Sequence, residues 1–104
     1  MRPIIRFLTR LGLMKEQRDT GARVPIHVGA RLELDEVVVR GTARDISVGG
    51  VFFETTAPIA PGVCGALARD GSRDLVPVRV SWARRAEGGE PAGLGLEFES
   101  NRRR

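Results

Sequence analysis

The sequence has little of several residue types that cross-linking and catalysis commonly use. It contains one cysteine, one histidine and no tyrosine in 104 residues. A single thiol cannot form an internal disulfide, and one cysteine with one histidine cannot complete a structural zinc site. No apolar run approaches the ~20 residues that span a bilayer. These absences exclude a disulfide scaffold, a zinc module and a transmembrane segment, and they favour a reducing, cytoplasmic setting.

What remains is typical of one small folded domain. Hydrophobic residues make up 41% of the chain and charged residues 29%, which is too apolar for a disordered sequence. A chain of 104 residues has room for one modest core and for no second lobe. We therefore expect a single domain with short segments at its two ends.

The net charge of +4 is unevenly distributed. Residues 1–23 carry six basic side chains against two acidic ones, residues 24–101 carry eight against eleven, and Arg102–Arg104 add three. Only 5% of the residues are aromatic, so the basic stripe with interleaved aromatics that is typical of long nucleic-acid surfaces is missing. The distribution argues against long nucleic acid and favours a small anion held near the N-terminal segment.

Residues 1–15 are predicted to form a short amphipathic helix, because apolar side chains recur on one face and arginines on the other. The apolar set is Ile4, Phe7, Leu8, Leu11 and Met14, and the basic set is Arg2, Arg6 and Arg10. We favour packing of this helix on its own domain; contact with a membrane surface or a partner protein is the alternative. Residues 16–23 are predicted to form a polar, basic arm, and residues 101–104 a basic tail.

From residue 24 onward the hydrophobic period is two, which is typical of strands. Strands are predicted over residues 24–34, 37–45, 51–55, 63–68, 76–82 and 94–98. The strand over residues 24–34 is predicted to bury the side chains at its even-numbered positions. Turn residues separate the strands, among them Asp35–Glu36, Gly49–Gly50, Pro61–Gly62 and Asp70–Gly71. Six strands at this spacing indicate an all-β fold, an antiparallel barrel or sandwich that occupies residues 24–100.

The sequence motifs of common enzymes are missing. No nucleophile elbow, metalloprotease helix, phosphate-binding loop or paired histidine is present. His27 lies on the polar side of the first predicted strand, where we expect a solvated side chain. Cys64 is expected to be a small packed side chain rather than a nucleophile. Gly93 and Gly95 lie in a strand that no helix follows, so they do not form a phosphate loop. The sequence therefore predicts a protein that is not an enzyme and that uses no cofactor or metal.

The chemistry that remains lies where the second predicted strand meets the third. The run Asp45-Ile46-Ser47-Val48-Gly49-Gly50 places a carboxylate and a hydroxyl two residues apart before a glycine pair. Asp45 can accept hydrogen bonds from a base edge or hold an arginine, Ser47 is a small donor, and Gly50 permits close approach to the backbone. Upstream, Arg18 and Arg23 flank the arm, and arginine grips phosphate or reads guanine. On residue types alone, a Ser or Asx turn that closes a β-corner is the simpler interpretation.

Four stretches of this sequence occur together in the order found in one known family. They are Arg23-Val24-Pro25-Ile26, the run from Asp45 to Phe52, Val80-Ser81-Trp82-Ala83-Arg84, and Gly93-Leu94-Gly95-Leu96-Glu97-Phe98. Over Gln17 to Phe98 the chain thereby resembles the PilZ domain, the bacterial receptor module for the second messenger cyclic di-GMP. The resemblance implies a six-stranded antiparallel β-barrel and a bacterial, cytoplasmic protein of signal transduction that binds this nucleotide.

In PilZ receptors the ligand is held by an RxxxR motif on the N-terminal arm and by a (D/N)xSxxG motif at the corner between the second and third strands. The corner motif is complete here as Asp45, Ser47 and Gly50. The resemblance implies that Asp45 and Ser47 face the guanine and that Gly49 and Gly50 lie beside the ligand.

The arm motif is altered. Arg23 occupies the second arginine position, but Asp19 stands four residues earlier, and the nearest arginine is Arg18. Side chains five residues apart on an extended segment point to opposite faces. Arg18 and Arg23 therefore clasp one ligand only if the arm bends between them, which Gly21 permits.

Three functions follow from these observations, in order of preference. The first is a cyclic di-GMP receptor, in which the arm orders around the nucleotide and repositions the 1–15 helix for a downstream protein partner. The second is a PilZ-like interaction adaptor that has lost nucleotide binding, which Asp19 favours. The third is association with a membrane surface through the basic residues at the two ends.

Overall fold

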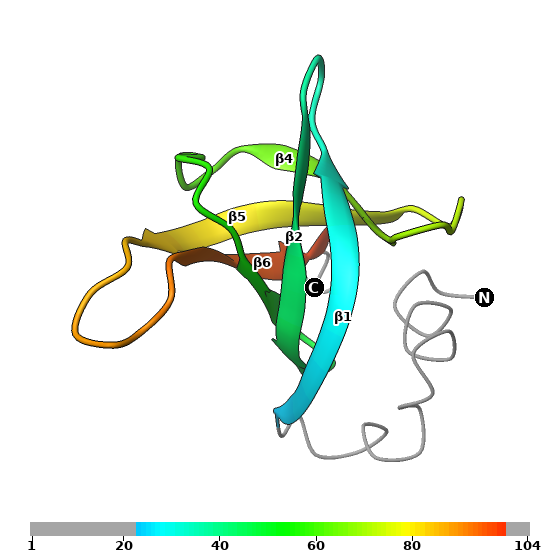
Figure 1. Cartoon of the computed structure of the whole chain (residues 1–104). Coiled ribbons are helices and arrows are strands. Elements are labelled where there is room, and N and C mark those ends of the chain that lie inside the picture. The colour runs from blue at the N-terminus through cyan, green and yellow to red at the C-terminus, as the bar shows by residue number, and fades with distance from the viewer. Residues whose placement is uncertain (1–22, 100–104) are drawn as a thin grey trace.

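The computed structural model describes residues 23–99 and shows six antiparallel strands closed into a barrel (Figure 1). The strands are β1 (Val24–Glu33), β2 (Val38–Ile46), β3 (Gly50–Glu54), β4 (Cys64–Arg69), β5 (Val76–Arg84) and β6 (Gly93–Phe98). Their order around the barrel is β1-β2-β3-β6-β5-β4, and β1 pairs with β4 to close it. The all-β barrel and all six predicted strands are confirmed, each within one or two residues of its predicted ends.

The segments outside the barrel were also assigned from sequence. The described residues do not include the predicted helix over residues 1–15, residues 16–22 of the arm or the 101–104 tail. Within residues 23–99, no helix is long and apolar enough to cross a membrane.

The barrel interior is filled by alternate residues of the strands. Its members are Ala30, Leu32, Val39, Ala43, Ile46, Val51, Phe53, Leu67, Val76, Val78, Val80, Leu94, Leu96 and Phe98. Phe53 and Phe98 are the largest, and both are fully buried. Burying one such side chain stabilises the fold by about 1.5–3 kcal/mol. In β1 the predicted even-numbered face points inward, because Ala30 and Leu32 are fully buried and Ile26 and Val28 pack against the core.

The inward alternation does not continue to the end of β5. If it continued past Val78 and Val80, Trp82 would also lie inside the barrel. The register with β6 shifts by one residue between Val80 and Trp82, and this bulge turns Trp82 outward, with 44% of its surface exposed. The Ser81 hydroxyl at the bulge donates a hydrogen bond to the Gly95 carbonyl at 3.0 Å. Trp82 therefore belongs to the outer wall and not to the core.

A second bulge lies in β2, and it determines the orientation of the corner motif. The register with β3 shifts by one residue between Ala43 and Asp45, which makes Arg44 the extra residue. Ala43 and Ile46 are both fully buried as a result, although they are three residues apart. Without the bulge, Asp45 would share the inward face of Ala43 and would bury its carboxylate in the apolar core. The bulge instead presents Asp45 on the outer wall.

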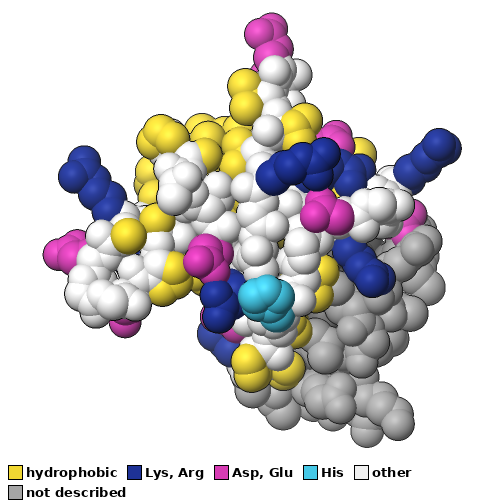
Figure 2. All heavy atoms as spheres, viewed as in Figure 1, with side chains coloured by type: hydrophobic (Ala, Val, Ile, Leu, Met, Phe, Trp, Pro, Cys, Tyr) yellow, Lys and Arg dark blue, Asp and Glu magenta, His cyan; other side chains and the backbone are white. Residues whose placement is uncertain are grey.

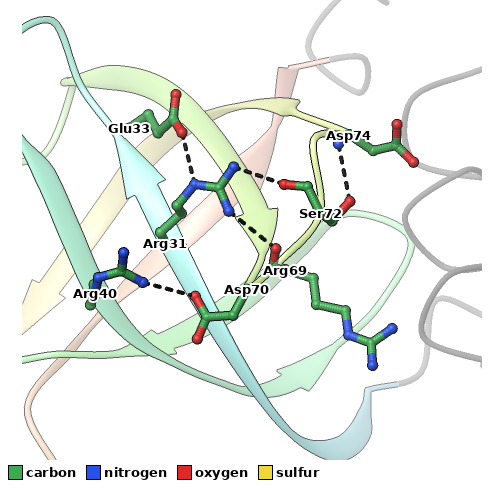
Figure 3. A network of polar contacts seen from close by, with 7 residues as sticks. All are labelled: Arg31, Glu33, Arg40, Arg69, Asp70, Ser72 and Asp74. Carbon is green, nitrogen blue, oxygen red and sulfur yellow. Dashed lines mark hydrogen bonds and ion pairs between the residues drawn. The ribbon is translucent and has the colours of Figure 1, made fainter.

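Arg31 of β1 holds the turn between β4 and β5 against the barrel (Figure 3). Its guanidinium donates to the Ser72 carbonyl at 2.8 Å, to the Arg69 carbonyl at 3.3 Å and to the Glu33 carboxylate at 2.8 Å. The Ser72 hydroxyl in turn accepts the Asp74 N–H at 3.0 Å. Only 19% of the Arg31 side chain is exposed, and its bonds to Ser72 and Glu33 are partly shielded from water. One side chain thus supports the strand pair that closes the barrel.

The surface carries charges of both signs. Figure 2 shows arginine and acidic side chains interspersed over one face, with the single histidine among them. His27 is exposed, as predicted. Cys64 is also exposed, so the expectation of a packed side chain is wrong. Alternation explains this, since Leu67 of β4 points inward, and Cys64 therefore lies on the outer face, where its Sγ is 3.2 Å from the Glu99 carboxylate.

Candidate functional site

The two bulges align four residues across the outer wall of the barrel. Asp45 of β2 pairs with Phe52 of β3, Phe52 pairs with Gly95 of β6, and Gly95 pairs with Trp82 of β5. Directly opposed residues of antiparallel strands point to the same side of a sheet. The row therefore carries an acid at one end and an indole ring at the other.

Two glycines of β6 provide the space in which the aromatic rings lie. A Cβ atom on Gly95 would lie 2.2 Å from the Trp82 ring, and one on Gly93 would lie 2.4 Å from the Phe52 ring. The Phe52 and Trp82 rings are stacked, with centroids 5.6 Å apart and planes inclined by 16°. The Arg84 guanidinium lies 4.8 Å from the Phe52 centroid, a cation–π arrangement. Gly93 and Gly95 thus serve packing, and Trp82 is held in place although it is partly exposed.

A pocket of about 270 Å³ lies beside Trp82. Its walls come from Arg23 ahead of β1, from the β2–β3 corner, and from β5 and β6. Four of the sequence-predicted site residues line it, namely Arg23, Ser47, Gly49 and Gly50. Asp45 does not line the pocket but contacts Arg23, and Arg18 lies outside the described residues. The structure therefore brings the described end of the arm and the corner motif together at one place.

Arg23 and Asp45 form the polar contact that joins the arm to the corner. The Arg23 Nε donates to Asp45 Oδ1 at 2.7 Å. The two side chains are 52% and 35% exposed, so water screens the pair. Exposed ion pairs of this kind contribute about 0–1 kcal/mol to stability. The pair orients the Arg23 guanidinium beside the pocket. Because the pair is weak, a ligand that displaces Asp45 from Arg23 loses little free energy in doing so.

Ser47 is the most buried polar residue of the site, at 5% exposure. Its hydroxyl accepts the Gly49 N–H at 3.2 Å, and its own N–H donates to the Gly50 carbonyl at 2.9 Å. The serine turn that sequence alone favoured is therefore present at this corner. The same hydroxyl carries a proton that it can donate toward the pocket.

The packing of the barrel explains why residue 50 is a glycine, independently of the binding motif. A Cβ atom at this position would lie 2.1 Å from the Leu96 carbonyl oxygen, on the neighbouring strand β6. A backbone atom cannot move aside as a flexible side chain can, so only glycine fits here. The backbone group that lies close to Gly50 is therefore the Leu96 carbonyl of β6.

Sequence reasoning missed Trp82 and Glu97 as residues of the pocket wall. Trp82 was missed because simple alternation along β5 predicts that it lies inside the barrel, whereas the bulge turns it outward. The position of Glu97 could have been predicted from the alternation of β6. Leu96 and Phe98 on either side of it are buried, so the Glu97 side chain lies on the outer face.

A larger hollow of about 600 Å³ lies elsewhere, between the segment 55–60 and the β5–β6 hairpin. It is lined mainly by small and apolar residues and contains none of the sequence-predicted site residues. This hollow is larger than the pocket beside Trp82, but the polar side chains that converge on the smaller pocket make that pocket the better candidate site.

A small closed barrel with a polar pocket and an aromatic wall on its outer surface is typical of a ligand-binding module. The family model of the PilZ domain matches residues 14–104, which is nearly the whole chain, and the chain belongs to this family. PilZ domains are binding and receptor domains, and cyclic di-GMP is the ligand associated with them. No curated protein sequence matches the chain.

Proposed function

We propose that this PilZ protein is a receptor for cyclic di-GMP and that the nucleotide binds in the pocket beside Trp82. The observation that carries the proposal is the meeting of the two motifs: Arg23 of the arm contacts Asp45 at 2.7 Å and lines the same pocket as Ser47. These side chains provide a cation for phosphate, a carboxylate acceptor and a hydroxyl donor. The Trp82 ring adds a flat apolar face, and stacking of one base on such a ring contributes about 1–3 kcal/mol.

The energetics favour exchange of the Arg23–Asp45 pair for a ligand. The exposed pair is worth about 0–1 kcal/mol, whereas a hydrogen bond to a charged group contributes about 1.5–3 kcal/mol. A phosphodiester that engages Arg23 therefore gains more than the pair loses. Asp45, once released or shared, is an acceptor for a guanine N–H.

In the proposed mechanism the ligand also engages the arm. Arg18 is the second phosphate contact, and the 16–23 arm orders around the nucleotide. That ordering repositions the 1–15 helix and passes the signal to a downstream protein partner. Residues 1–22 lie outside the described residues, and the support for this mechanism is the motif spacing and the position of Arg23 at the pocket.

The test is isothermal titration calorimetry of the full chain with cyclic di-GMP. Wild-type protein is expected to bind saturably, and Arg23→Ala is expected to weaken binding at least about tenfold, since a charge-assisted contact is lost. Arg40→Ala is the matched control, because Arg40 lies on the outer face of β2 and pairs with Asp70 at 3.3 Å, away from the pocket. No heat from folded wild-type protein at high ligand concentration would overturn the proposal.

The second candidate is a PilZ adaptor that has lost nucleotide binding, and Asp19 at the first arginine position of the motif favours it. An acid near the site would repel a phosphate. Under this alternative the titration gives no heat, and deletion of residues 1–15 abolishes capture of the protein partner. Retained capture after the deletion would argue against a docking role for that segment.

A further inference from the structure

The hairpin that joins β1 to β2 projects beyond the rest of the barrel (Figure 1). Pairing of β3 with β2 reaches no further than Thr42, and pairing of β4 with β1 ends at Glu33, so neither neighbouring strand flanks the tip. A hydrogen bond of 2.8 Å from the Leu34 N–H to the Val37 carbonyl closes the turn. The hairpin tip, residues 35–38, is therefore an ordered turn that stands clear of the barrel wall.

The hairpin tip combines apolar and acidic side chains that the barrel itself does not use. Val37 and Val38 are adjacent, and they are 55% and 54% exposed. Asp35 and Glu36 precede them, are exposed, and form no side-chain ion pair or hydrogen bond with any described residue. Figure 2 shows acidic and apolar atoms side by side at this projecting end of the molecule. A surface that receives the tip must therefore be apolar and carry positive charge.

A surface of that kind is present on the same molecule. The hollow of about 600 Å³ between the segment 55–60 and the β5–β6 hairpin is lined mainly by small and apolar residues. Leu94 belongs to the core, and Ala57 and Ile59 pack against it, so the apolar lining of the hollow is continuous with the core. Within residues 23–99, no acidic side chain lines this hollow.

Two adjacent arginines at the end of β5 line the hollow, and they differ in the partners they have. Arg84 donates to the Pro91 carbonyl at 3.0 Å and pairs with Glu90 at 2.9 Å, so its charge is already balanced. Arg85 is exposed and has no ion pair or hydrogen bond in the part of the chain that the structure describes. The hollow thus presents an apolar lining beside one positive charge that lacks a counter-ion.

The hairpin tip and the hollow are complementary in polarity and in charge, but they lie at different places on the molecule. In Figure 1 the tip is at the top and the loop between β5 and β6 is at the lower left, so one copy cannot insert its own tip into its own hollow. We propose that the hairpin tip of one copy docks into the hollow of a second copy. Val37 and Val38 then meet the apolar lining, and the acidic pair before them meets Arg85.

This contact is heterologous, because the two surfaces that meet are different. A heterologous contact joins copies head to tail and leaves one free tip and one free hollow at the ends of a dimer. The tip is small, and interfaces below about 1,200 Å² are weak and transient. Association is therefore expected only at high protein concentration.

Sedimentation equilibrium of the full chain tests the proposal. Wild-type protein is measured from about 10 μM to 1 mM in about 0.15 M salt, a range that covers weak dissociation constants. Its weight-average mass is expected to rise above that of the monomer as the concentration increases. No nucleotide is added, so the outcome is independent of the proposed receptor function.

Two variants each remove one of the two surfaces. Val37→Asp places a carboxylate where the tip enters the apolar lining, and Arg85→Glu reverses the charge of the hollow. Each variant alone is expected to associate at least about tenfold more weakly than wild type, since a charge-assisted contact or the apolar burial is lost. An equimolar mixture of the two variants still contains one native tip and one native hollow. The mixture is expected to form a one-to-one dimer with the wild-type affinity and no larger species.

Leu75→Asp and Arg73→Glu are the matched controls. They make the same changes of side chain at two exposed positions between β4 and β5, outside the hollow. Both are expected to associate as wild type does. A melting curve for each variant confirms that the barrel is folded.

Three results would overturn the proposal. The first is wild-type protein that stays monomeric up to about 1 mM, which would leave the hollow to a different partner. The second is association that Val37→Asp or Arg85→Glu leaves unchanged, which would place the contact between copies elsewhere on the chain. The third is a mixture of the two variants that fails to associate, because a tip-to-hollow contact requires the native surfaces to restore it.

Discussion

The Arg23 guanidinium and the Asp45 carboxylate lie 2.7 Å apart on the outer wall of the barrel, although 22 residues separate them in the chain. Arg23 is the last residue of the arm, and Asp45 lies at the bulged end of β2. The contact therefore joins the two halves of the proposed nucleotide site. A ligand does not need to gather these groups from a distance, which lowers the entropic cost of binding.

Replacement of Asp45 by alanine is expected to separate binding from stability. The exposed ion pair contributes about 0–1 kcal/mol, so the free energy of unfolding should change by no more than this. The affinity for cyclic di-GMP should fall about tenfold or more, because both the acceptor and the orientation of Arg23 are lost. Calorimetry and urea denaturation measure the two quantities. Unchanged affinity would show that Asp45 is not part of the site.

Replacement of Gly95 by alanine is expected to displace the indole of Trp82. The added Cβ would lie 2.2 Å from the Trp82 ring, so the stacked pair with Phe52 must shift. Overpacking of this kind costs about 1–3 kcal/mol. Trp82 is the single tryptophan of the chain, so a change in its fluorescence spectrum reports the displacement directly.

Gly29→Ala is the matched control for that substitution. Its added Cβ would meet Asp70 Oδ2 at 2.6 Å, the end of an exposed side chain that can move away. Stability and fluorescence should both remain close to those of wild type. Equal effects of the two substitutions would contradict the close packing of Trp82 on Gly95.

Replacement of Gly50 by alanine is expected to act through the fold. The new Cβ would lie 2.1 Å from the Leu96 carbonyl, so β3 and β6 would have to move apart. We expect a loss of more than about 2 kcal/mol in the free energy of unfolding, since backbone must give way. Thermal melting followed by circular dichroism measures this. A variant that melts like wild type yet loses nucleotide binding would instead show that Gly50 acts on the ligand.

Replacement of Arg31 by alanine is expected to loosen the β4–β5 turn. Its partly buried hydrogen bond to the Ser72 carbonyl and its exposed one to the Arg69 carbonyl would be lost, at a cost of about 1.5–3 kcal/mol. Arg40→Ala should cost less than about 1 kcal/mol, since its pair with Asp70 is exposed. Urea unfolding followed by Trp82 fluorescence compares the two variants. Similar losses would refute the role assigned to Arg31.

The strands were predictable from sequence because burial of one face imposes a period of two. The even-numbered face of β1 shows this, with Ala30 and Leu32 in the core. Trp82 was not predictable in this way. A one-residue bulge at Ser81 reverses the alternation, and the local pattern Val78-Arg79-Val80-Ser81 does not predict this bulge.

The candidate site was predictable in part for a related reason. Ser47 and Gly49 lie in a short contiguous motif, and the structure places both at the pocket. Glu97 comes from a strand distant in sequence, and only the barrel order, with β6 beside β3, brings it there. The contact between Arg23 and Asp45 likewise depends on pairing between β1 and β2.

The closure of the barrel also restricts how another protein can recognise this domain. Within residues 23–99 each of the six strands is paired on both sides, since β1 and β4 complete the ring. The β1–β4 pairing covers Ala30–Glu33 of β1, so closure removes part of the sheet edge, and not all of it, from β-augmentation by a partner peptide. Over the paired stretches, another protein can recognise the barrel only through side chains and loops, because the backbone hydrogen bonds there are already made within the sheet.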